Sequence, residues 1–144
     1  MCYVCLVFFA FILVLLSLEA DTRSALVVTP IWFLLLAVLG TVFGLGGVLR
    51  FRRQGTTVTP LHPEQASALV TGGLYRLSRN PMYLGLLCWT MALACYLGGL
   101  AVWLGPLLLW GWLSRFQIVP EEQALQRRFG EAYANYCRRV RRWC

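Results

Sequence analysis

Three long stretches of the chain are apolar and contain no charged residue. They cover residues 1–18, 24–49 and 80–114, which are 18, 26 and 35 residues long. A charged side chain at the centre of a spanning helix costs about 2.5–3.5 kcal/mol on insertion scales, so such stretches are typical of transmembrane segments. About 20 residues of helix cross a hydrocarbon core of about 30 Å. The pattern therefore predicts helices near residues 2–18 and 25–49, and more than one helix in the third stretch.

The third stretch is too long for one helix, because it would extend about 52 Å at about 1.5 Å per residue. The adjacent Gly98 and Gly99 divide it into arms over residues 81–97 and 100–119. The second arm reaches full length if Arg115 extends its side chain toward the lipid headgroups. The sequence thus predicts an all-α integral membrane protein of about four transmembrane helices, with a C-terminal helical hairpin, in a single domain over residues 1–144.

Composition and charge support this interpretation. Only 13% of the residues are charged, against about 25% in soluble domains, which excludes an ordinary soluble enzyme. All thirteen basic residues are arginines, and twelve of them lie on one side, eleven after the second and fourth predicted helices and Arg115 near the end of the fourth. The positive-inside rule then places the loop over residues 50–80, the tail and both termini in the cytoplasm. Since the arginines follow the membrane topology, we expect a lipid bilayer and no nucleic acid as partner.

The polar tail has the pattern of an amphipathic helix over residues 120–142. Its apolar positions recur every three or four residues, at Leu125, Phe129, Tyr133, Tyr136 and Val140. Such a helix either lies on the anionic membrane surface or covers a polar site. The acids Glu121 and Glu122 either complement the helix dipole or form a polar pocket with residues 79–81 at the start of the third helix.

Other residues have simpler explanations. Pro81 suits the first turn of a helix, whose free N–H groups attract anions, and Tyr75 and Tyr83 place aromatic rings nearby. Gly40 and Gly44 have the spacing that lets membrane helices approach closely. The cysteines and the single histidine have no metal-ligand arrangement, so we expect no bound metal.

Two motifs carry further information. The first runs Leu69-Val-Thr-Gly-Gly-Leu-Tyr75 and continues as Arg79-Asn80-Pro81-Met-Tyr83-Leu-Gly85, and the second joins Glu121-Glu122 to Leu125, Phe129-Gly130 and Tyr133. In order and spacing they resemble the isoprenylcysteine carboxyl methyltransferase family and the similar phospholipid methyltransferases, as a small bacterial-type member. The resemblance covers about half of the chain, residues 67–140.

The resemblance implies S-adenosyl-L-methionine as the cofactor and methyl transfer to a lipophilic acceptor at the cytoplasmic membrane face. The acceptor would be a prenylcysteine-like carboxylate or a lipid headgroup amine. The implied cofactor contacts are Ser67, Ala68, Leu69, Val70, Tyr75, Asn80, Pro81, Met82, Tyr83 and Glu121. No catalytic residue is assigned.

The chain departs from the family pattern at two positions. Asn80 stands where isoprenylcysteine enzymes usually have histidine, which preserves hydrogen bonding but removes a titrating group. Gln117 stands four residues before Glu121, where those enzymes have an arginine, and Arg115 is the nearest cation. Gln117 and Arg115 are therefore the candidate acceptor-binding residues. Two alternatives stay open, an NADPH-dependent membrane reductase of the sterol reductase type and a non-catalytic membrane scaffold or transporter subunit.

Overall fold

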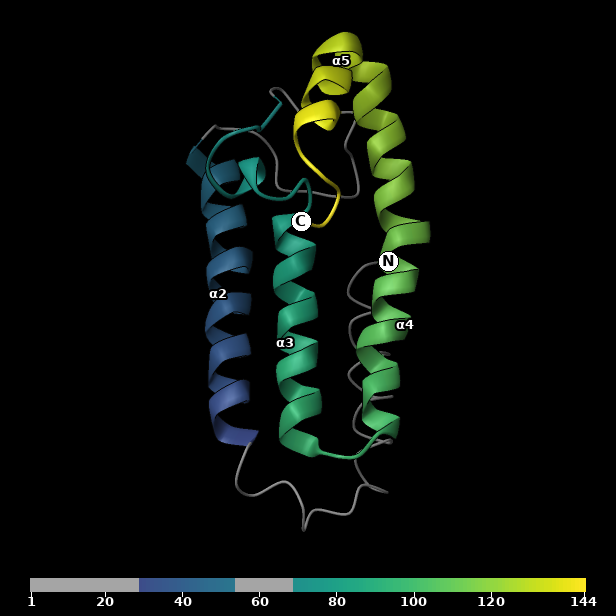
Figure 1. Cartoon of the computed structure of the whole chain (residues 1–144). Coiled ribbons are helices and arrows are strands. Elements are labelled where there is room, and N and C mark those ends of the chain that lie inside the picture. The colour runs from purple at the N-terminus through teal and green to yellow at the C-terminus, as the bar shows by residue number, and fades with distance from the viewer. Residues whose placement is uncertain (1–28, 54–68) are drawn as a thin grey trace.

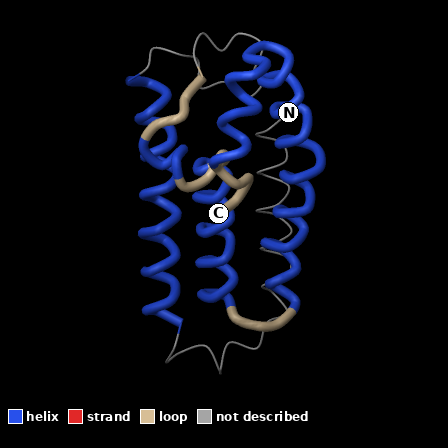
Figure 2. The backbone as a smooth tube through the Cα atoms, turned by 45° about the horizontal axis from the view of Figure 1, so that its top comes forward, coloured by secondary structure: helices blue, strands red, loops and turns tan. Residues whose placement is uncertain are grey.

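The computed structural model describes residues 29–53 and 69–144. The helix predicted near residues 2–18, and the candidate cofactor residues Ser67 and Ala68, lie outside the described residues. All regular structure within the described ranges is helical, which agrees with the expected fold class (Figure 2).

Three helices lie side by side in alternating directions, α2 (Thr29–Arg53), α3 (Pro81–Leu97) and α4 (Leu104–Trp112) (Figure 1). The bounds of α3 coincide with the expected arm over residues 81–97, whereas α2 continues four residues beyond its expected end. Within α2, Pro30–Arg50 is long and apolar enough to cross a membrane, and α3 is a shorter apolar helix. Large side chains on α2 such as Ile31 and Leu34 are 71% and 60% exposed, as lipid-facing residues would be. These features support a place in the membrane, and the count of four spans stays a prediction.

Glycine lets α2 and α3 approach to backbone contact. A Cβ atom added to Gly85 would lie 2.6 Å from the backbone nitrogen of Gly44 and 2.7 Å from the carbonyl oxygen of Gly40. A Cβ atom on Gly40 would in turn lie 2.6 Å from Cδ1 of Trp89. Gly40 and Gly44 therefore serve helix packing, as their spacing predicts.

The turn after α3 lies at the expected glycine pair. Gly98 and Gly99 have φ values of 72° and 81°, in a region that glycine enters without steric cost. The chain then rises through the 3₁₀ turn η3 (Ala101–Trp103), α4, the π-helical segment η4 (Leu113–Ile118) and α5 (Val119–Arg139). α4, η4 and the first half of α5 form one continuous rod (Figure 1). No interruption separates the expected spanning arm from the expected tail helix near residue 119.

The tail differs from the single helix expected over residues 120–142. Gly130 has φ 50° and ψ −119°, which breaks α5, and the helix ends at Arg139. Glycine permits this backbone because it has no Cβ atom. The second half of α5 therefore folds back toward the loop before α3 (Figure 1). Its apolar stripe packs on the protein itself, in a cluster of Tyr133, Tyr136 and Val140 with Leu69, Leu125, Phe129 and Cys137.

Residues beyond α5 return to the start of α3. Val140 is extended, and the backbone N–H of Arg79 donates to the carbonyl oxygen of Arg141 at 3.0 Å. Trp143 then packs against an apolar cluster between α3 and the rod, formed by Leu87, Leu109, Leu113 and Ile118. We call residues 140–143 the C-terminal strap.

Candidate active site

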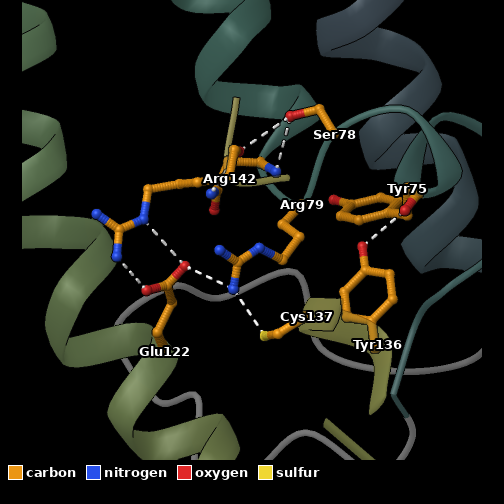
Figure 3. A network of polar contacts seen from close by, with 8 residues as sticks. Tyr75, Ser78, Arg79, Glu122, Tyr136, Cys137 and Arg142 are labelled. Atoms are coloured by element: carbon orange, nitrogen blue, oxygen red, sulfur yellow. Dashed lines mark hydrogen bonds and ion pairs between the residues drawn. The ribbon is translucent and has the colours of Figure 1, made fainter. Parts of the chain in front are cut away.

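Four segments meet at one end of the helices, where the apolar core gives way to polar side chains. They are η2 (Gly73–Arg76), the start of α3, the start of α5 and the C-terminal strap (Figures 1 and 3). Pro81 occupies the first position of α3, where its missing N–H costs no hydrogen bond. This fixes where α3 begins and sets Asn80 and Arg79 just before it, facing the strap.

Glu121 and Tyr83 join the start of α5 to the first turn of α3. The hydroxyl of Tyr83 donates to Oε2 of Glu121 at 3.0 Å. Burial and the nearby Glu121 carboxyl, with a smaller effect of Tyr136, raise the pKa of Tyr75. Tyr75, Tyr83 and Glu121 therefore form one cluster, although they lie as much as 46 residues apart in sequence.

The Glu121 carboxyl is the most perturbed acid of the described residues. Burial raises its pKa from 4.5 to about 7, the hydrogen bond from Tyr83 lowers it, and the adjacent Glu122 raises it further. The two described ion pairs both use Glu122, so no arginine of the described ranges neutralises Glu121. A desolvated carboxyl that lacks a cation in this way is a common feature of functional sites.

Glu122 is the centre of an ionic network beside this cluster (Figure 3). Its Oε1 lies 3.2 Å from Nη1 of Arg79, and the side chains of these two residues are only 18% and 16% exposed. Arg142 binds the same carboxylate with both ends of its guanidinium, Nη2 to Oε2 at 2.6 Å and Nε to Oε1 at 3.2 Å. Such bidentate pairs fix orientation as well as charge. The network holds the start of α5 and the strap against the residues before α3.

Backbone groups complete the attachment of the strap. The carbonyl oxygen of Arg142 accepts from the Ser78 hydroxyl at 3.2 Å and from Nδ2 of Asn80 at 3.1 Å. The amide of Asn80 therefore acts as a donor to the strap. This is chemistry that a neutral histidine could also perform, so the departure from the family residue at this position is structurally conservative.

Tyr136 fastens the folded-back half of α5 to η2. Its hydroxyl donates to the carbonyl oxygen of Tyr75 at 2.7 Å (Figure 3). Burial raises the pKa of Tyr136 to about 12, with Arg79 acting in the opposite direction. The donor therefore stays protonated and fixes the backbone of η2 at neutral pH.

The residues expected to contact the cofactor divide into two groups. Tyr75, Asn80, Pro81, Tyr83 and Glu121 gather at the meeting point of the four segments, as the pairing of the two motifs predicts. Leu69 instead packs in the tail cluster, Val70 is buried, and the side chain of Met82 packs on Gly47 of α2.

The two expected acceptor-binding residues lie on the π-helical segment. Arg115 is exposed and Gln117 is half-buried, and neither has a hydrogen bond or ion pair in the described ranges. Their role in acceptor binding stays a prediction.

Several residues of the site were not expected from the sequence. Two of them, Ser78 and Tyr136, donate to backbone carbonyl oxygens. The third, Arg142, binds Glu122, which is one member of an acidic pair. An arginine in a run of arginines carries no signal that it is the one that binds Glu122. Only the Glu121-Glu122 pair opposite residues 79–81 indicated that an ionic contact would form here, and the pair of Arg79 with Glu122 confirms that contact.

A model of one protein family covers most of the chain. The family is described as phospholipid methyltransferase, and its model matches residues 28–132. The chain belongs to this family. The match includes all of α2, α3 and α4, the described part of the loop before α3 and the start of α5, so it contains the cluster of Tyr75, Tyr83 and Glu121.

Curated relatives agree with this assignment. A probable protein-S-isoprenylcysteine O-methyltransferase of Oryza sativa subsp. japonica is 33% identical over 114 residues, which are 76% of this chain and 60% of the relative. The protein-S-isoprenylcysteine O-methyltransferase B of Arabidopsis thaliana is 27% identical over 107 residues, 74% of this chain and 54% of the relative. The chain thus spans somewhat more than half the length of these relatives.

A second, shorter similarity concerns transporters. The D-serine/D-alanine/glycine transporter of Escherichia coli K12 is 60% identical over 43 residues, which are 30% of this chain but only 9% of the transporter. A match of this length corresponds to about two membrane helices. It describes a shared segment and not a shared architecture.

Proposed function

We propose that this chain is an S-adenosyl-L-methionine-dependent methyltransferase that modifies a lipophilic acceptor at the cytoplasmic face of the membrane. The observation that carries the proposal is the half-buried Glu121 carboxyl, which has no cationic partner in the described ranges and lies beside Tyr75 and Tyr83. Family membership supports the reaction class. The arginine distribution supports the cytoplasmic face.

The residues present fit this cofactor. S-adenosylmethionine supplies an electrophilic methyl group on a cationic sulfur, and it also carries an ammonium group and ribose hydroxyls. Glu121 would accept hydrogen bonds from a cationic or hydroxyl group, and the rings of Tyr75 and Tyr83 present faces that attract a cation. The turn over residues 80–83 and the stretch over residues 67–70 complete the set by resemblance to the family.

The apolar surroundings suit an acceptor with a hydrocarbon chain. Exposed leucines on the last turns of α2, Leu45 at 58% and Leu49 at 52%, lie next to the polar end of the helices. The hydrocarbon chain of an amphiphile in the bilayer would therefore contact apolar side chains beside the polar site. Methyl transfer by in-line displacement gains most of its rate from such positioning. A carboxylate acceptor needs no general base, whereas an amine must first lose a proton.

Calorimetric titration of the detergent-purified protein with S-adenosylhomocysteine tests this function. We expect saturable binding that Glu121→Gln weakens by about tenfold or more, because a hydrogen bond to a charged group contributes about 1.5–3 kcal/mol. Glu131→Gln is the matched control, since Glu131 is exposed on the same helix, and it should bind as the parent does.

The same titration with NADPH separates the alternatives. Binding of NADPH alone would assign the protein to the reductases, and binding of neither ligand would favour the scaffold. The transporter similarity does not favour a transporter subunit, because it covers less than a tenth of the transporter's length.

A further inference from the structure

Arg50 lies on the last turns of α2 and packs its side chain onto Gly72 and Gly73, at the start of η2. A Cβ atom added to Gly72 would lie 3.1 Å from Cζ and 3.2 Å from Nε of Arg50, and closer still to Nη2. Gly72 has an ordinary extended backbone, with φ −102° and ψ 164°, which any residue adopts. A side chain at this position would have to displace the guanidinium, so glycine here makes room for Arg50 and is not needed for the conformation of the chain.

The charge of Arg50 is unmatched in the described part of the chain. Its Nε atom is buried and makes no hydrogen bond there, and Arg50 takes part in neither ion pair, because Glu122 is shared by Arg79 and Arg142. A buried donor without an acceptor loses its hydrogen bond to water and gains none in return, which is unfavourable. The arrangement is therefore suited to receive an oxyanion, whose oxygens accept from the guanidinium in two parallel bonds.

Arg50 borders the same motif that forms the proposed methyl-transfer site. A Cβ atom on Gly46 would meet the side chain of Leu74, next to Tyr75, and a Cβ atom on Gly47 would meet Met82, next to Tyr83. The arginine thus stands one helical turn above these contacts, where the exposed apolar face of α2 ends. It lies on the opposite side of α3 from the rod that carries Gln117, because α3 stands between α2 and α4 (Figure 1).

We propose that Arg50, seated on Gly72 and Gly73, binds the anionic group of the methyl acceptor, a phosphate or carboxylate whose hydrocarbon chain lies along the apolar face of α2. The inference rests on the proposed function and specifies its substrate class as an acidic amphiphile. It also accounts for the absence of an arginine at position 117, because the cation that pairs with the acceptor stands on α2 instead.

A nonspecific headgroup anchor would behave differently. Arg52, two residues further along α2, is exposed and is free to extend toward any headgroup, as arginines at helix ends do. Arg50 instead has its Nε atom enclosed against the loop. Arg52→Gln is therefore the matched control for Arg50→Gln.

The test measures binding of two pairs of amphiphiles to the full-length protein in detergent by thermophoresis. One pair is N-acetyl-S-farnesylcysteine and its neutral methyl ester, and the other is dihexanoylphosphatidic acid and dihexanoylglycerol. We expect the protein to bind the anionic member of at least one pair about tenfold more tightly than its neutral counterpart, the preference that one charge-assisted contact provides. The pair that shows the preference identifies the anion as carboxylate or phosphate.

Two variants should abolish the preference by different routes. Arg50→Gln removes the charge. Gly72→Ala keeps the charge and an allowed backbone but displaces the guanidinium. It therefore tests the position of the Arg50 side chain even if Arg50→Gln folds poorly. Arg52→Gln, and Gly111→Ala with open space around its Cβ position, should keep the preference.

Equal binding of anionic and neutral members, or an unchanged preference in both Arg50→Gln and Gly72→Ala, would overturn the inference. Titration of the same samples with S-adenosylhomocysteine separates this failure from that of the proposed function. Intact cofactor binding without an anion preference rejects only the role of Arg50. An anion preference without cofactor binding rejects only the methyltransferase.

Discussion

The contact between α2 and α3 and the polar end above it are stabilised in opposite ways. In the helix contact, Gly40, Gly44 and Gly85 bring two backbones together with no side chain between them. At the polar end, Glu122 and two arginines join segments that are distant in sequence. The helix contact depends on glycines that have no side chain, and the polar end depends on ion pairs.

The helix contact mainly stabilises the fold, whereas the polar end also contains the proposed ligand-binding residues. Membrane helices associate through close packing, because burial away from lipid provides no hydrophobic driving force. The glycine contact therefore tolerates little increase in side-chain size. The polar end contains a carboxyl, Glu121, that is costly to bury and does not help the fold. We therefore expect substitutions in the first region to destabilise the folded protein, and those in the second to affect either stability or ligand binding.

The largest effect should come from Gly85→Ala. The added Cβ atom would meet two backbone atoms of α2 within 2.7 Å, and backbone cannot rotate away as a side chain can. We expect a loss of about 3 kcal/mol or more, at the upper end of overpacking costs, measured by reversible unfolding in mixed micelles followed by circular dichroism. Gly111→Ala is the control and should be neutral or stabilising, because nothing lies near its Cβ position. Equal stability of the two variants would show that the helices do not meet here.

Second in size is the pH dependence caused by Glu121. Its pKa of about 7 in the folded protein exceeds the ordinary value of 4.5, so the folded state binds the proton more tightly than the unfolded state. Its contribution is complete below about pH 4.5 and is lost as the pH rises through 7. The pKa difference corresponds to at most about 3 kcal/mol.

Unfolding measured from pH 5 to pH 8 checks this dependence. Glu122, Arg79 and Arg142 also lie near the site, so the contribution of Glu121 is the part of the slope that Glu121→Gln removes. The same slope in both proteins would show that the pKa of the Glu121 carboxyl is not raised in the folded protein.

The two regions also differ in how far the sequence predicted them. The bounds of α3, the turn at Gly98 and the meeting of Glu121 with the start of α3 follow from local signals, namely Pro81, a glycine pair and an acidic pair. The break at Gly130 does not, because the apolar stripe continues through it at helical spacing and a single glycine is tolerated in a helix.

Contacts that end on backbone atoms were equally hidden. The strap is held through the carbonyl oxygens of Arg141 and Arg142, and every residue has such an oxygen, so no residue type marks it. The contact of Arg50 with Gly72 could not be predicted for a related reason. Glycine is common in loops, so its presence at position 72 does not indicate that an arginine side chain packs on it.

The third prediction concerns the ionic network. Glu122→Gln leaves Arg79, whose side chain is 16% exposed, without its carboxylate, and it also releases Arg142. We expect a loss of about 1–2 kcal/mol of stability, less than for a fully buried pair because Arg142 is partly solvated. Binding of S-adenosylhomocysteine should change much less than in Glu121→Gln. If Glu122→Gln weakens that binding more than Glu121→Gln does, the roles of the two acids are reversed.

The smallest effect should come from Tyr136→Phe, which tests whether the folded-back half of α5 stabilises the loop beneath it. The substitution removes only the hydroxyl that donates to the carbonyl oxygen of Tyr75 at 2.7 Å, and it leaves a buried acceptor unpaired. We expect a loss of about 1 kcal/mol in the same unfolding assay. Tyr96→Phe is the control, because Tyr96 is 63% exposed on α3. A matching loss in Tyr96→Phe, or none in Tyr136→Phe, would mean that the tail covers η2 without fixing it.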